Sequence, residues 1–137
     1  MNRFSTFVFY VSNIEETIAF YEKAFGLKRR FIDETGHYGE LETGSTALAF
    51  ASEQLGDTNL PRGYRKFTPK ELPPGCAITF CTKDVTASFS KALKAGATLV
   101  APLADKPWGQ TIGYVRDPNG ILIEISSEMH VNTIQET

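Results

Sequence analysis

Hydrophobic and polar positions in the first part of the chain follow two periodicities, and their order predicts five elements. Residues 4–11 are aromatic and β-branched, which indicates a strand. Ser12 and Glu15 then form the pattern of a capping box, and apolar residues recur at helical spacing until Gly26. Three more strand-like segments follow, at 27–31, 38–42 and 46–51. The predicted order is β, α, β, β, β.

The same order recurs from residue 76, with strand-like residues 76–81 followed by a helical stripe that ends at Gly96, 70 residues after Gly26. Strand-like segments follow at 98–101, 110–115 and 121–127. The sequence therefore predicts one α+β domain over 1–137 that is built from two tandem βαβββ modules. Its parts are module one 4–51, linker 52–75, module two 76–128 and tail 129–137.

The segment 52–75 contains four prolines and no apolar periodicity. A connection this long, without elements of its own, indicates either a binding lid or a flexible linker. Its basic residues come without an acid between Pro61 and Lys70, which suits a solvated linker or a lid that favours anions. These basic residues are Arg62, Arg65, Lys66 and Lys70.

The composition and net charge limit the kinds of binding partner that we expect for this protein. The chain has 137 residues and a net charge of −2, so it lacks the basic surface expected of a nucleic-acid-binding protein. No apolar run approaches the ~18 residues of a membrane span, and the N-terminus does not resemble a signal peptide, so we expect no membrane partner and a cytoplasmic protein. Cys76 and Cys81 would lie ~16 Å apart along one strand, too far for a disulfide, and are expected as free thiols.

Two stretches resemble the halves of a known superfamily. Residues 9–30 (FYVSNIEETIAFYEKAFGLKRR) and 108–127 (WGQTIGYVRDPNGILIEISS) are similar to the glyoxalase/bleomycin-resistance/extradiol-dioxygenase superfamily, also called the vicinal oxygen chelate fold. The resemblance implies a curled mixed sheet around a cleft and a homodimer. In members that use a metal, it implies ligands from the first and last strands of each module. The matching positions are Thr6, Leu48 or Ala49, Cys76 and Glu124.

This donor set predicts no firmly held metal cofactor. A catalytic divalent ion usually needs about three imidazole or carboxylate ligands, and only Glu124 is a ready one. Cys76 would bind only as a thiolate and would favour a softer ion. Of the two histidines, His37 is expected in an exposed turn and His130 in the tail. Glu124 and Cys76 are thus the residual candidates if a divalent metal is bound.

Glu124 lies between two isoleucines in the last predicted strand. A carboxylate among apolar residues needs a partner, a raised pKa or an open cleft. It is a structural acid, a general base or hydrogen-bond anchor, or a surviving metal ligand. A basic residue of the second module, Arg116, could pair with an anionic ligand or with a nearby surface acid, and the surface acid is favoured.

Aromatic and amide side chains complete the predicted site. Tyr38 shares a strand face with Glu40, and Trp108 stands in a Pro/Gly loop where it would stack on a planar ligand or cap the core. The candidate ligand-binding residues are Phe7, Phe9, Tyr38, Phe50, Trp108, Gln110 and Tyr114.

The first functional hypothesis is a small-molecule-binding protein with a degenerate metal site and a planar or anionic organic ligand, similar to the antibiotic-sequestering branch of the superfamily. The alternative is a metal-assisted glyoxalase-like lyase or isomerase, or a dioxygenase-like enzyme, with Glu124 as base or ligand. A third hypothesis is a dimeric scaffold whose cleft is filled by its own side chains.

Overall fold

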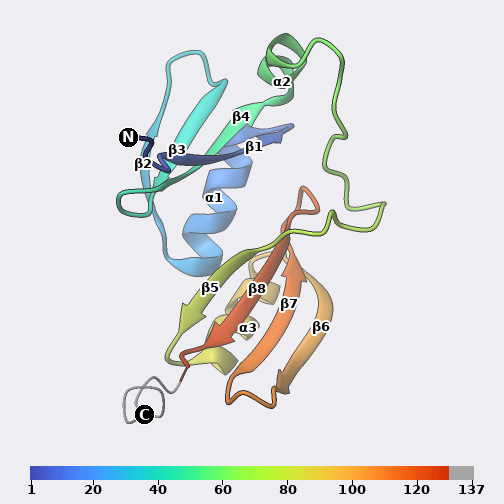
Figure 1. Cartoon of the computed structure of the whole chain (residues 1–137). Helices are drawn as coiled ribbons and strands as arrows, with labels where there is room; N and C mark the ends of the chain where they lie inside the picture. Colours follow the sequence, from blue (N-terminus) through green and yellow to red (C-terminus); the bar gives the residue numbers. More distant parts are fainter. Residues whose placement is uncertain (130–137) are drawn as a thin grey trace. The chain divides into compact units, whose positions relative to one another are not determined.

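The computed structural model describes residues 1–129, and the chain divides after Thr68 into two compact units (Figure 1). Each unit contains one four-stranded mixed sheet, in the order β1-β4-β3-β2 in the first and β5-β8-β7-β6 in the second. The sheets have the same topology, so the predicted α+β fold of tandem βαβββ modules is confirmed. His130 lies outside the described residues.

The first unit contains β1 (Thr6–Val11), α1 (Ile14–Phe25), β2 (Lys28–Ile32), β3 (Tyr38–Glu42), β4 (Ala47–Ser52) and α2 (Glu53–Asn59). The second contains β5 (Ile78–Thr82), α3 (Val85–Lys94), β6 (Thr98–Asp105), β7 (Thr111–Arg116) and β8 (Leu122–Ser127). In both units the first and last strands pair in parallel, and the other neighbours pair antiparallel. No helix within residues 1–129 has the length and apolar character that a membrane crossing needs.

Helix α1 begins one residue later than the sequence pattern indicates. Asn13, not Ser12, is the N-cap, and its side chain accepts a hydrogen bond from the Glu16 N–H at 2.9 Å. At the other end Gly26 has a positive φ of 68° and its N–H donates to the Glu22 carbonyl, as in a left-handed cap. The predicted helix is therefore correct, but its capping box is not.

Helices α1 and α3 each cover one face of the sheet in their own unit. In the first unit Tyr21 stacks on Phe50 of the central strand β4, with ring centroids 5.2 Å apart, and both side chains are fully buried. In the second unit Phe89 of α3 is buried against the sheet beside Gly113. Because strand residues alternate between faces, β4 presents Leu48 and Phe50 to α1 and small residues to the other face.

Neither α1 nor α3 covers the opposite face of the sheet in its unit, and we call that face the open face; in the first unit α2 reaches its edge, where Asn59 donates a hydrogen bond to the Tyr10 hydroxyl at 3.3 Å. In the first unit the open face carries three buried alanines from β4, flanked by side chains of β1 and β3. In the second unit it carries Glu124 and Ser126 from β8 and Tyr114 from β7. The alanines of β4 are Ala47, Ala49 and Ala51.

The predicted linker is not structureless. Its first part forms α2, whose N-cap Ser52 accepts a hydrogen bond from the Leu55 N–H at 3.1 Å. Tyr64 then packs against Gly56 and lies 5.4 Å from the ring of Tyr10, so this part of the segment is bound to the first unit. The sequence pattern missed α2 because a helix of seven residues around a glycine shows no apolar stripe.

The remaining part of this segment is held by the second unit. Arg116 donates hydrogen bonds to the carbonyls of Glu71, at 2.6 Å, and Gly120, at 2.9 Å. The adjoining turn is built on buried Asp117, whose carboxylate accepts from the N–H groups of Asn119 and Ile121.

Two glycines allow the helices to approach the sheets. A Cβ on Gly39 would lie 2.6 Å from Ile18 Cδ1 of α1, and one on Gly113 would lie 2.5 Å from Phe89 Cε1 of α3. Register places Gly39 opposite Phe50 and Gly113 opposite Ile125, so they occupy the same position in the repeat. Any larger residue there would force the helix away from the sheet.

We expect Gly113→Ala to destabilise the protein by about 1–3 kcal/mol, because the added methyl group also lies 3.1 Å from the Leu103 backbone nitrogen, which cannot rotate away. Gly75→Ala is the matched control, since a Cβ there meets nothing within 4 Å. Urea unfolding measures both. Equal midpoints for the two variants would contradict the close packing of α3 on β7.

Candidate functional site

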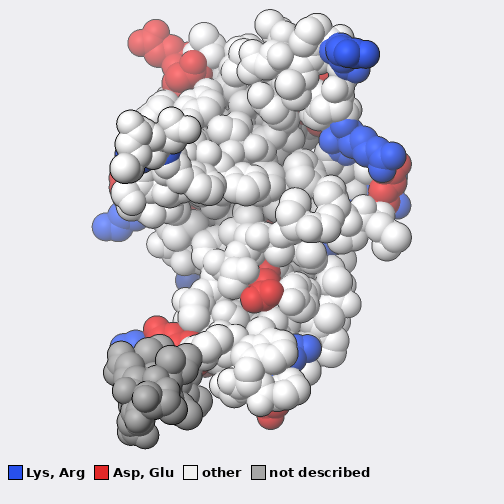
Figure 2. Space-filling view, viewed as in Figure 1, with Lys and Arg blue, Asp and Glu red and all other residues white. Residues whose placement is uncertain are grey.

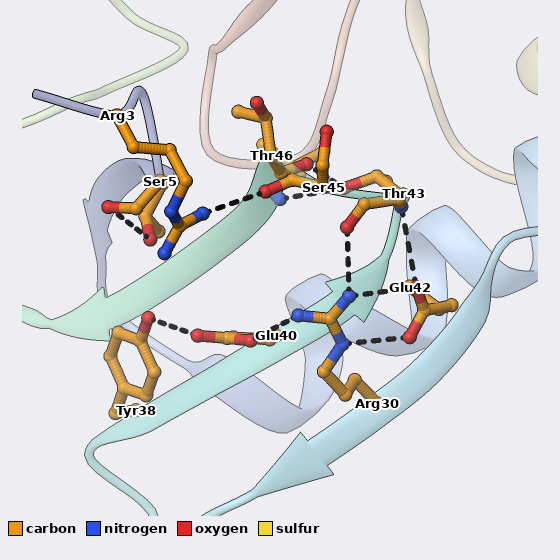
Figure 3. Close-up of polar contacts among 12 residues, drawn as sticks. Arg3, Ser5, Arg30, Tyr38, Glu40, Glu42, Thr43, Ser45 and Thr46 are labelled. Carbon is orange, nitrogen blue, oxygen red and sulfur yellow. Dashed lines mark hydrogen bonds and ion pairs between the residues drawn. The ribbon is translucent and has the colours of Figure 1, made fainter. Parts of the chain in front are cut away.

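The open face of the first unit carries a network of charged and phenolic side chains (Figure 3). The Tyr38 hydroxyl donates to Glu40 Oε2 at 2.7 Å, and Arg30 Nη1 donates to Glu40 Oε1 at 3.1 Å. Arg30 also binds both carboxylate oxygens of Glu42, each at 2.8 Å. A register shift in β2 between Arg29 and Phe31 makes Arg30 the extra residue that reaches these two glutamates.

The network changes the acidity of its members. Hydrogen bonds from Arg30 and from the Gly44 N–H lower the pKa of Glu42 to about 2. Burial, and then the hydrogen bond to Glu40, raises the pKa of Tyr38 to about 12. Both carboxylates of the network bind one guanidinium, whose own pKa is raised by its bond to Glu42. This arrangement is complete without a ligand.

The open face of the second unit carries a simpler pair. Tyr114 on β7 lies directly opposite Glu124 on β8, and its hydroxyl donates to Glu124 Oε2 at 2.8 Å. That hydrogen bond, then burial and the negative charge, raises the pKa of Tyr114. Within residues 1–129 no cation pairs with Glu124, and its other oxygen, Oε1, accepts no hydrogen bond. Glu124 is thus a half-buried carboxylate with one oxygen available.

Register settles which residues of the two modules correspond. Ala49 pairs with Val8 and Glu40, whereas Glu124 pairs with Thr79 and Tyr114, so the first module has alanine where the second has Glu124. Of the two positions left open, Leu48 and Ala49, the match is therefore Ala49, because Leu48 faces α1.

The first-strand match shifts by one residue as well. The helix N-caps Asn13 and Asp84 are 71 residues apart, so Thr6 corresponds to Ala77 and not to Cys76. Cys76 precedes β5 and is exposed, and both cysteines are free, as predicted.

Within residues 1–129, the positions that match the superfamily's metal ligands do not supply a set that fits a divalent ion. The four corresponding positions offer a threonine, two alanines and Glu124, which is one strong ligand where about three are needed. Among residues 1–129 no three His, Cys, Asp or Glu side chains are grouped so that they could hold an ion.

Three predicted ligand-binding aromatics lie on the face that α1 covers. Phe50 is fully buried under Tyr21, and Phe9 is 4% exposed and lies 5.6 Å from the ring of Phe67. Phe7 stacks on Phe9 at 4.7 Å and is 46% exposed at the sheet edge. The structure thus separates these three side chains from Tyr38, which lies on the open face.

Trp108 and Gln110 lie together in the loop before β7. The Trp108 indole N–H donates to Gln110 Oε1 at 2.8 Å, and Gln110 Nε2 donates to the Ser127 carbonyl at 2.9 Å. The indole is 56% exposed. Ser127 is three residues beyond Glu124 on β8, so the loop lies ~10 Å along the sheet from the carboxylate.

Sequence reasoning missed two polar contacts of the first unit. Arg30 was not singled out, although three acceptors converge on it, because only the β2 register places it beside Glu40 and Glu42. His37 is half-buried rather than exposed, and its Nδ1 lies 2.8 Å from Ser52 Oγ. The sequence signal that could have indicated the His37 contact was Ser52, a residue of the helix-capping type just before α2.

Comparison with known proteins gives the same architecture. The family model of the Glyoxalase/Bleomycin resistance protein/Dioxygenase superfamily matches residues 3–125. A glyoxalase-related enzyme from Fulvimarina pelagi superposes with a TM-score of 0.79 at 20% identity, covering 93% of this chain and 89% of that one. TioX from Micromonospora sp. ML1 superposes with a TM-score of 0.65 at 22% identity, covering 93% and 100%. Identities this low indicate a shared fold.

A shorter match occurs at higher identity. The uncharacterized protein Mb0911c of Mycobacterium bovis is 43% identical over 60 residues, which are 42% of this chain. The matched segment covers only 39% of the length of that relative.

Because the pKa of Tyr38 is raised in the folded protein, the free energy of unfolding depends on pH in the alkaline range. The unfolded phenol ionises near 10.0 and the folded one near 12, so its contribution is complete below pH 10 and is lost as the pH rises toward 12. We expect Tyr38→Phe to remove this part of the decline, as measured by urea unfolding across that interval. A variant whose stability falls as steeply as that of the wild type would contradict this assignment.

Proposed function

We propose that this chain, which belongs to the Glyoxalase/Bleomycin resistance protein/Dioxygenase superfamily, binds a small planar organic molecule on the open face of its second unit. The observation that carries the proposal is the carboxylate of Glu124, which is half-buried, held by Tyr114 and unpaired at Oε1 within the described residues. A buried or half-buried carboxylate that no cation balances is a place where an incoming hydrogen-bond donor is stabilising.

The two open faces differ in what they leave available. In the first unit Arg30 already balances Glu40 at 3.1 Å. In the second unit Tyr114 orients Glu124 but contributes no charge, since its raised pKa keeps the phenol neutral at ordinary pH. A ligand with an N–H or O–H group would complete the hydrogen bonding of Glu124. Of the planar and anionic ligands considered from the sequence, this charge favours the planar, non-anionic one.

The surroundings of Glu124 support a flat ligand. On the same face, Glu124 has the short side chains of Thr79 on β5 and Ser126 on β8 to one side, and the larger Tyr114 and Leu122 to the other, so a flat ligand can approach over Thr79 and Ser126. Trp108 is more than half exposed ~10 Å away and offers an indole face for stacking. We assign Glu124 as the anchor, Tyr114 as a positioning residue and Trp108 with Gln110 as the outer wall.

The test is a thermal-shift screen of planar heteroaromatic compounds that carry an amino or hydroxyl group, each beside its N- or O-methylated counterpart. A bound compound at about 100 times its Kd stabilises the protein by about 2.7 kcal/mol. We expect Glu124→Gln to weaken binding of a hit about tenfold, because a charge-assisted hydrogen bond becomes a neutral one.

Glu128→Gln is the matched control, since it removes an exposed carboxylate four residues further along the same unit. Its affinity should equal that of the wild type. Methylated compounds that bind as well as their parents, or a Glu124→Gln variant with unchanged affinity, would rule out Glu124 as the anchor.

The single strong ligand among the four corresponding positions also predicts the behaviour toward metals. Protein purified without chelators should contain far less than one equivalent of zinc, manganese, iron or nickel, as measured by mass spectrometry of the elements. Added ions should not change the affinity for a hit. Stoichiometric metal that Glu124→Gln releases would instead support the metal-assisted enzyme.

A further inference from the structure

One pocket of the first unit holds a histidine beside a serine hydroxyl. The pocket has a volume of about 460 Å³ and lies where the end of β4 meets the starts of α1 and α2. His37 and Ser52 both line it, and His37 Nδ1 lies 2.8 Å from Ser52 Oγ. All of its lining residues belong to the first unit, so this pair is separate from Glu124 and Tyr114.

The hydrogen bonds of Ser52 indicate where the proton between the two side chains lies. Ser52 Oγ accepts from the Leu55 N–H at 3.1 Å, and this contact uses a lone pair of the oxygen rather than the hydroxyl hydrogen. That hydrogen can therefore be donated to His37 Nδ1 when the imidazole is neutral and carries its own proton at Nε2. A hydroxyl that donates to an imidazole nitrogen at this distance has the geometry of a nucleophile with its general base.

The backbone holds both residues of the pair in place. Tyr38 pairs with Ala51 in the antiparallel ladder of β3 and β4, so His37 lies opposite Ser52 at the end of that ladder. The Ser52 N–H donates to the His37 carbonyl at 2.8 Å, and the His37 N–H donates to Asp33 Oδ1 at 3.2 Å. The imidazole is thus positioned through its own backbone, whereas in a Ser-His-Asp triad a third side chain orients it.

Two side-chain amides of the pocket can bind a carbonyl oxygen. Asn13 and Gln54 both line the pocket. Asn13 Oδ1 already accepts from the Glu16 N–H at 2.9 Å, so the amide presents its NH₂ group to the surroundings. Amide N–H groups beside a nucleophile stabilise the negative charge that develops on the oxygen of an attacked carbonyl.

The other lining residues indicate which kind of substrate the pocket would accept. Ile14 and Ile32 supply an apolar wall, which suits a short hydrocarbon group. Glu15 and Glu53 also line the pocket, and their carboxylates would repel an anionic substrate. The pocket therefore favours a small, uncharged molecule.

We propose that Ser52 is a nucleophile, with His37 as its general base, and that it takes the acyl group from a small uncharged carboxylic ester. His37 Nδ1 accepts the hydroxyl proton as Ser52 Oγ forms a bond to the ester carbonyl carbon. The bond from that carbon to the alcohol oxygen then breaks, and the alcohol leaves with the proton. A water molecule, deprotonated in the same way by His37, releases the acyl group as a carboxylic acid, and the proton returns to Ser52.

The experiment treats the full chain with diisopropyl fluorophosphate, a small uncharged reagent, and locates the modified residue by peptide mass spectrometry. Ser52 Oγ forms a bond to phosphorus, fluoride leaves, and His37 takes the proton. We expect one phosphoryl group on each chain, at Ser52. His37→Gln should lower the labelling rate about a hundredfold, because glutamine is polar but is not a base. Prior labelling should also abolish hydrolysis of p-nitrophenyl acetate by the protein.

Two further variants separate the nucleophile from the helix cap. Ser52→Asn keeps a side-chain oxygen that can cap α2 but removes the hydroxyl, so it should abolish labelling. Ser45→Ala is the matched control, because Ser45 is an exposed serine of the same unit outside the pocket, and it should be labelled at the wild-type rate. Melting curves establish that every variant is folded.

Four results would each overturn the proposal. They are no labelling of the wild type, labelling spread over several serines, an unchanged rate in His37→Gln, and ester hydrolysis that persists after Ser52 is labelled.

Discussion

One helix for each four-stranded sheet is the constraint on which the rest of this structure depends. Burying one face against α1 or α3 removes a row of large apolar side chains from water, which is the main source of stability in a module of this size. The close approach requires glycine at positions 39 and 113. The second face of each sheet lies outside this packing, and polar side chains can occupy it without disturbing the helix–sheet core.

The polar residues of the open faces follow different chemistry in the two units, although the backbone topology is shared. In the first unit Tyr38 and Glu40 lie on one strand and a register shift brings Arg30 to Glu40, so this acid has a cationic partner within the unit. In the second unit Tyr114 and Glu124 face each other across two strands, with no cation among the described residues. Figure 2 shows basic and acidic side chains scattered among uncharged ones on the face that it draws. The repeated fold thus carries two ion-paired acids, Glu40 and Glu42, in one unit and the available acid Glu124 in the other.

The positions of helices and strands were easier to predict from the sequence than the question of which sheet face is covered by a helix. The helix ending at Gly26 and the order of strands follow from local periodicity, since each signal lies within a dozen residues. Alternation along β1 places Phe7 and Phe9 on one face, but only the contact of Phe50 with Tyr21 shows that this face is the covered one. The alternation along β4 likewise places Leu48 and Ala49 on opposite faces of the sheet. Which of the two faces the ligand position depends on the parallel pairing of β1 with β4, and local periodicity in the sequence does not predict that pairing.

The difference between Glu40 and Glu124 has a consequence for how such a fold acquires a ligand. Removing Arg30 would leave Glu40 and Glu42 as unbalanced acids on one sheet, at a cost to stability, so that network resists change. Glu124 already has its orienting partner in Tyr114, and two of its neighbours on this face, Thr79 and Ser126, have short side chains. Substitutions around it can therefore alter the shape of the surface without breaking an ion pair. Recognition is easier to develop at Glu124, where the charge is held in place but not neutralised.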